Sequence, residues 1–148
     1  MKKIFIYFSN SGNGDVVADY LKEKDIDIRK VITKEPLPKS FILSILSGGF
    51  KATSNHKDKL NDFDSDISKY DEIIIGSPIW NARFSSPINT VLSLLNLEGK
   101  KVSFILYSGS GESPKATKRI KEQYPEATIY DLKNPKDNIK ELDKLNLL

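Results

Sequence analysis

Residues 9–14 have the types and spacing of an anion-binding loop. In order they are Ser9, Asn10, Ser11, Gly12, Asn13 and Gly14. They connect an apolar run at 4–8 to an amphipathic helical pattern that begins at Val16. A helix that starts in such a loop presents free backbone N–H groups and a partial positive charge to a phosphate. Small side chains allow close approach, and the hydroxyls of Ser9 and Ser11 can donate to phosphate oxygens.

The same residue types also form ordinary strand-to-helix turns, so a capped turn without a ligand remains an alternative. Other classes of phosphate-binding protein are excluded because their sequence motifs are absent. The loop contains neither GxGxxG nor GxxxxGK[ST], which argues against a dinucleotide-binding Rossmann domain and a P-loop NTPase. The strand ends in Phe8-Ser9-Asn10 and lacks the acidic residues that a receiver domain needs there.

Two later apolar runs, at 73–75 and 102–106, also end in small-residue loops. The loop after the first run carries Trp80, the only tryptophan of the chain. The loop after the second run reads Ser108-Gly109-Ser110-Gly111. In an open parallel α/β sheet, ligands bind outside the carboxyl ends of the strands. The three loops together therefore predict a site for a flat, phosphorylated ligand.

At this point the sequence resembles the flavodoxin family over nearly the whole chain. The segments that carry the resemblance are FSNSGNG, GSPIWNARFSSPINTVL and YSGSGES. It implies that the first loop binds the phosphate of FMN and that the other two flank the isoalloxazine. The implied FMN-binding residues are Ser9, Asn10, Ser11, Gly12, Asn13, Gly14, Pro78, Ile79, Trp80, Asn81, Ser108, Gly109, Ser110 and Gly111.

The first loop departs from the family pattern at two positions. The family usually has Thr or Ser where Gly14 stands, so one hydroxyl donor is missing. Asp15 suits the helix dipole but lies close to the expected phosphate, so we expect it to weaken FMN binding. We expect Trp80 to stack on the flavin, with a core or rim aromatic as the alternative. Asn81 tolerates positive φ and is our candidate for a backbone rearrangement near flavin N5.

Composition limits the classes of protein that fit. The 148 residues suit a single domain, 1–148, and the absence of Cys excludes disulfides and thiolate chemistry. No apolar run reaches the roughly 18 residues of a membrane span, and no signal peptide precedes the first strand, so we expect a cytoplasmic protein. The net charge is +3, but no basic stripe interleaved with aromatics indicates nucleic-acid binding.

Alternating apolar runs and helical patterns predict a doubly wound α/β fold, flavodoxin-like, with helices on both faces of a five-stranded parallel sheet in the order 2-1-3-4-5. Expected strands cover 2–9, 26–33, 71–77, 101–108 and 127–132, and expected helices cover 14–24, 60–68, 86–96, 113–124 and 135–145. The segment 34–56 is longer than a simple connection requires. We consider it a lid, a dimer surface or a packed elaboration, with His56 on the surface.

The favoured function is that of an FMN-binding, low-molecular-weight electron carrier. An NAD(P)H-dependent flavin or quinone reductase is the first alternative, and a diverged interaction module without flavin is the second. The sequence indicates no catalytic triad and no metal site. Expected partners are redox proteins or a small-molecule electron donor or acceptor, with no nucleic acid or membrane. The protein is expected to be a monomer or a homodimer.

Overall fold

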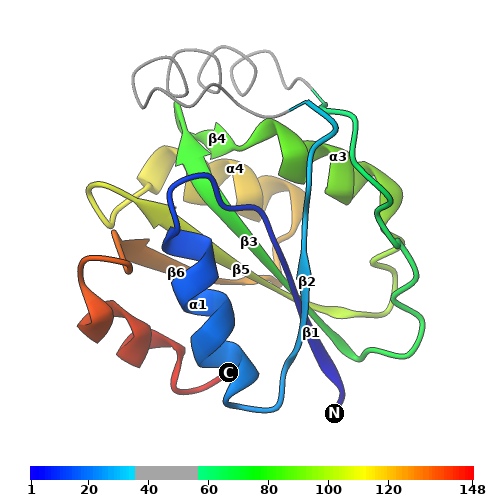
Figure 1. The fold of residues 1–148 in the computed structure, drawn as a ribbon, viewed down its shortest axis with the longest axis horizontal. Helices are drawn as coiled ribbons and strands as arrows, with labels where there is room; N and C mark the ends of the chain where they lie inside the picture. Colours follow the sequence, from blue (N-terminus) through cyan, green and yellow to red (C-terminus); the bar gives the residue numbers. More distant parts are fainter. Residues whose placement is uncertain (36–56) are drawn as a thin grey trace.

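A computed structural model describes residues 1–35 and 57–148. Five parallel strands form its central sheet: β1 Lys3–Tyr7, β2 Asp27–Lys30, β3 Glu72–Trp80, β5 Lys101–Ser108 and β6 Thr128–Lys133. Their spatial order is β2-β1-β3-β5-β6, with the registers of parallel pairs throughout (Figure 1). The predicted fold class and strand order are confirmed. A two-residue strand, β4 Arg83–Phe84, pairs antiparallel with the end of β3 and was not predicted.

Helices cover both faces of this sheet because the strand residues alternate in direction. The helices of the described residues are α1 Asn13–Lys22, α3 Ser86–Leu94 and α4 Pro114–Gln123, followed by the 3-10 helix η1 Ile139–Leu145. On one face, Phe5, Ile74 and Ile105 of the strands pack with residues of α1 and η1. On the other face, Ile73 and Phe104 pack with residues of α3 and α4. None of the helices in the described ranges has the length and apolar character needed to cross a membrane.

The predicted helix at 60–68 is wrong. Leu60 forms an isolated antiparallel bridge with Thr33, and no helix follows it up to β3. The backbone N–H of Asp66 donates to Asp64 Oδ1 at 2.9 Å, and that of Ser68 donates to Asp66 Oδ1 at 2.9 Å. These local side-chain acceptors compete with helical hydrogen bonding, which explains why the apolar spacing failed to specify a helix.

The last helix of the chain is shorter than predicted, because it begins at Ile139 rather than near Pro135. It is also a 3-10 helix, which is wound more tightly than an α-helix. Strand β3 runs to Trp80, three residues beyond its predicted end. Segment 34–56 is expected to form a lid, a dimer surface or a packed elaboration, with His56 on the surface. Residues 36–56, which include His56, lie outside the described residues.

Candidate functional site

A cavity of about 560 Å³ lies at the carboxyl edge of the sheet, where the three predicted loops meet. Its lining residues are Asn10, Ser11, Asn13, Pro78, Ile79, Trp80, Asn81, Tyr107, Ser108, Gly109, Asn134, Lys136 and Asp137. The structure therefore brings together side chains from all three loops that the sequence singled out. Of the predicted site residues, Ser9, Gly12, Gly14, Ser110 and Gly111 do not line this cavity.

Ser9 shapes the first loop from within. Its Oγ accepts the backbone N–H of Gly12 at 3.2 Å and that of Gly14 at 3.1 Å. Gly12 has a φ of 96°, which favours glycine, and its carbonyl accepts the N–H of Val16 in the first helical turn. These bonds hold the start of α1 against the loop, with Ser11 and Asn13 facing the cavity.

Gly14 has no room for the hydroxyl side chain that the family usually carries. A Cβ placed there would lie 2.6 Å from Tyr107 Oη and 2.8 Å from Tyr7 Cδ2. The Tyr107 hydroxyl is buried and donates to the Phe8 carbonyl, and burial raises the pKa of this phenol well above its usual value. Two tyrosines from β1 and β5 thus occupy the space beneath the loop and require glycine above them.

Asp15 is turned toward β2 and is not among the residues that line the cavity. Its Oδ1 accepts hydrogen bonds from Lys30 Nζ at 2.6 Å and from Tyr7 Oη at 2.8 Å. Partial burial opposes ionisation, but the bonds from Lys30 and Tyr7 outweigh it and hold the pKa of Asp15 below its usual value. The carboxylate is therefore ionised and paired, which reduces the phosphate repulsion that the sequence alone predicted.

Trp80 both lines the cavity and packs in the core. It is 9% exposed and meets Phe8 edge-on, with ring centroids 6.0 Å apart. Trp80 therefore has one side available to the cavity and another packed in the core, so its position is compatible with both predicted roles. Asn81 and Ala82 follow it with φ of 49° and 59° and form a two-residue hairpin turn of the kind that right-twisted strands favour.

Contacts beneath and beside the hairpin hold it in place. The Arg119 guanidinium of α4 donates to the Ala82 carbonyl at 2.8 Å. At the base, the buried Ser77 Oγ accepts the backbone N–H of Ser85 at 3.0 Å. The positive φ of Asn81 agrees with the sequence analysis, whereas the pairing that produces this turn was missed.

The loop after β5 forms the opposite wall through Ser108 and Gly109. Ser108 Oγ accepts the backbone N–H of Gly111 at 3.1 Å, and Gly111 has a φ of 72°. Ser110 is exposed and donates its hydroxyl to the Glu112 carbonyl at 2.8 Å. Ser110 and Gly111 therefore shape this loop, while their two predecessors face the cavity.

A fourth loop, 134–137 after β6, was missed by the sequence analysis. The backbone N–H of Lys136 donates to Asn13 Oδ1 at 3.1 Å, and Lys136 Nζ donates to the Ser11 carbonyl at 3.1 Å. This loop also follows the carboxyl end of a parallel strand, so the rule that ligands bind at that edge could have identified it. Its Asn-Pro-Lys-Asp sequence lacks the small residues that drew attention to the other three.

The fold and the cavity define a doubly wound α/β protein with a ligand site at the carboxyl edge of its sheet. The Flavodoxin family model matches residues 2–145. The chain belongs to the flavodoxin family. No curated protein matches it in sequence.

Similar solved structures support the fold. A candidate flavoprotein of Bacteroides eggerthii has a TM-score of 0.70 at 22% identity, with 96% of each chain covered. A candidate flavoprotein of Bacteroides uniformis has a TM-score of 0.66 at 23% identity, covering 87% of this chain and 89% of that one. A flavoprotein of Lactobacillus acidophilus, solved in complex with FMN, has a TM-score of 0.67 at 21% identity, covering 94% and 97%.

Proposed function

We propose that the protein binds FMN in this cavity and transfers electrons through it. The observation that carries the proposal is the division of the cavity into two chemically different parts. The polar part lies at the N-terminus of α1 and is lined by Ser11 and Asn13, where helix geometry favours a phosphate. The other part is lined by Pro78, Ile79 and Trp80 and offers apolar surface to a flat ring.

The residues of the cavity fit FMN in type and arrangement. Trp80 and its neighbours would cover one side of the ring, and Ser108 with Gly109 would cover the other. FMN supplies the redox chemistry when bound, while the protein orients it and tunes its surroundings. The Bacteroides proteins and the FMN-bound Lactobacillus protein share this fold, which supports the assignment.

The favoured role is that of a small cytoplasmic electron carrier that exchanges electrons with redox proteins or with a small molecule. A specific observation also favours an NAD(P)H-dependent reductase. A second cavity of about 280 Å³ adjoins the hairpin and is bordered by Ala82, Phe84, Arg83 and Arg119. Two arginines in its lining, Arg83 and Arg119, suit a negatively charged substrate. Steady-state oxidation of NADH or NADPH by the FMN-loaded protein would favour the reductase, and its absence would favour the carrier.

Titration of the apo-protein with FMN and with riboflavin tests the binding proposal. FMN should bind more tightly than riboflavin and should quench Trp80 fluorescence. Ser11→Ala should weaken FMN by about 0.5–1.5 kcal/mol and leave riboflavin unchanged, because one hydrogen bond to the phosphate is lost. Ser93→Ala is the control, since Ser93 is an exposed serine of α3 and does not line the cavity. Equal affinities for the two flavins would contradict the phosphate assignment, and no flavin binding would favour the interaction module.

A further inference from the structure

We propose that Lys136 pairs with the ligand phosphate and makes this site selective for a phosphorylated flavin. The inference rests on the proposed function, because it assigns a residue of the same cavity to one part of the same ligand. Nothing in the first three loops supplies a cation at this position. The lysine comes instead from the loop after β6, more than 120 residues along the chain from the residues it contacts.

The position of Lys136 is determined by a tightly bonded turn. The Asn134 backbone N–H donates to the Ser108 carbonyl at 3.0 Å, which ties the turn to the loop after β5. The Asp137 and Asn138 N–H groups return to the Asn134 carbonyl at 2.9 and 3.0 Å. The Lys136 backbone N–H binds the Asn13 side chain, so the turn is joined to the start of α1 as well. Little backbone freedom remains to be lost when a ligand arrives.

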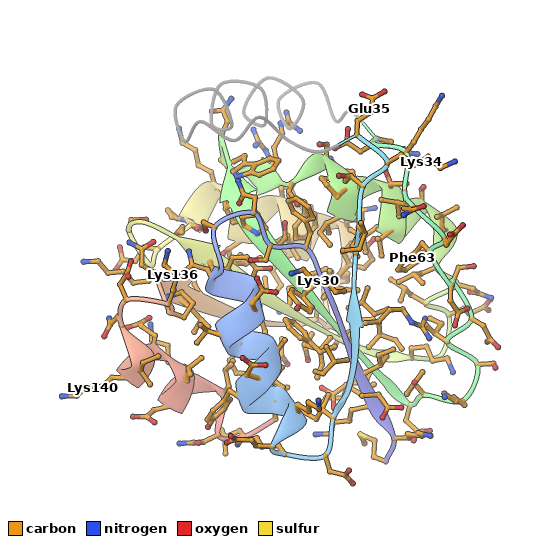
Figure 2. The ribbon with its side chains drawn as sticks, viewed as in Figure 1. Lys30, Lys34, Glu35, Phe63, Lys136 and Lys140 are labelled. Atoms are coloured by element: carbon orange, nitrogen blue, oxygen red, sulfur yellow. The ribbon has the colours of Figure 1, made fainter. Side chains whose placement is uncertain are left out.

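The side chain of Lys136 runs along the phosphate loop. A Cβ on Gly12 would lie 3.1 Å from Lys136 Cδ, so the aliphatic stem passes directly over that glycine. The ammonium then reaches the Ser11 carbonyl at 3.1 Å, beside the hydroxyl and amide groups that line the polar end of the cavity. In Figure 2 Lys136 lies beside the N-terminal end of α1, whereas Lys140 projects outward from η1.

The charge of this ammonium is not neutralised by an ion pair. Within residues 1–35 and 57–148, no carboxylate forms a salt bridge with Lys136. Residues 36–56 contain no Asp or Glu. Two carboxylates lie near this end of the cavity, and neither pairs with Lys136. Asp137 lines the cavity without a salt bridge to Lys136, and Asp15 is paired with Lys30. A phosphate would therefore give Lys136 an anionic partner in place of a neutral carbonyl.

The lysine also compensates for the missing hydroxyl at Gly14. A charge-assisted hydrogen bond is stronger than the neutral one that a Thr or Ser hydroxyl would make. It also depends on ionic strength, because the charges lie near the surface. FMN affinity should therefore fall as salt rises, while riboflavin affinity should change little.

The test measures FMN and riboflavin affinities of the full chain and of Lys136→Gln at low and high salt. Lys136→Gln should weaken FMN about 10-fold, the size expected for one hydrogen bond to a charged group, and should leave riboflavin unchanged. It should also flatten the salt dependence of FMN binding. Lys136→Arg should retain most of the affinity, and Lys140→Gln, which removes an exposed lysine of the same region, should match the parent protein.

The outcomes separate this inference from the proposed function. If the parent protein binds no flavin, the proposed function fails. If it binds FMN and Lys136→Gln binds FMN equally well at low salt, the function stands and the role of Lys136 is wrong. An equal loss for FMN and riboflavin would show that Lys136 only shapes the loop, and this also overturns the inference. Thermal unfolding of each variant confirms that the fold is intact.

Discussion

The loops after β1 and β5 share a local motif and differ in what the chain does next. Each has a serine whose Oγ accepts the N–H of a glycine three residues later, and each of these glycines has positive φ. The sequences SNSG and SGSG are correspondingly alike. The same serine-to-glycine spacing thus forms the same small turn at two places in this protein, Ser9–Gly12 and Ser108–Gly111.

The first loop continues directly into a helix, and the second does not. Ser9 accepts a second N–H, from Gly14 within α1, whereas Ser110 donates to the Glu112 carbonyl of its own loop. Helix α4 begins only at Pro114, which has no N–H to offer a ligand. The comparison teaches that the local motif shapes the loop, while the start of the following helix decides whether the loop includes N–H groups of a helix N-terminus.

The sharpest test of this comparison is a methyl group added to one glycine in each loop. Gly14→Ala should destabilise the protein by about 3 kcal/mol, because the Cβ would overlap Tyr107, Tyr7 and Ser9 in a packed region. Gly109→Ala should change stability by less than about 0.5 kcal/mol, since nothing lies within 4 Å of the added atom. Chemical denaturation measures both. Equal effects would show that the packing beneath the first loop relaxes freely.

The two serines should differ by the number of N–H groups they accept. Ser9→Ala leaves the N–H groups of Gly12 and Gly14 without their acceptor and should cost about 2 kcal/mol of stability. Ser108→Ala removes the acceptor of one N–H, that of Gly111, and a 3.5 Å contact with the exposed Ser110 hydroxyl, and should cost about 1 kcal/mol. Urea denaturation of the two variants gives the difference, and a larger loss for Ser108→Ala would contradict the comparison.

The smallest expected effects are changes of stability with pH. They have opposite signs for Asp15, which follows the first loop, and for Asp131 of β6. The pKa of Asp15 lies below its usual 3.8, so its stabilising contribution is present above that pH and is lost as pH falls through the folded value. Its side chain is 42% exposed, which limits the effect to less than about 1 kcal/mol. Asp15→Asn should therefore be less stable than the parent at pH 7, and the deficit should disappear in acid.

Asp131, which accepts from Ser113 at the start of α4, should behave in the reverse way. Burial raises its pKa above 3.8, so its contribution is present below that pH and is lost as pH rises through the folded value. Asp131→Asn should match or exceed the parent in stability at pH 7, and its advantage should shrink in acid. Denaturation between pH 3 and pH 7 tests the pair. Parallel pH profiles for the two variants would contradict the assigned shifts.

Local sequence was sufficient to predict the sheet and the edge that carries the site. Apolar runs such as 73–75 and 102–106 specify buried strands, and the alternation with helices implies parallel pairing. Parallel strands place their carboxyl ends together, so the three loops meet by topology. The same local reasoning failed at 60–68, where Asp and Ser side chains satisfy the backbone without forming a helix.

Contacts between distant segments were decided only by the tertiary structure. The need for glycine at residue 14 comes from Tyr107, the pairing of Asp15 comes from Lys30, and the ammonium at the Ser11 carbonyl comes from Lys136. Residue type sets what a local backbone can adopt and which side chains prefer burial. Which side chains then meet depends on how the strands are ordered and how closely the helices pack, and no local spacing contains that information.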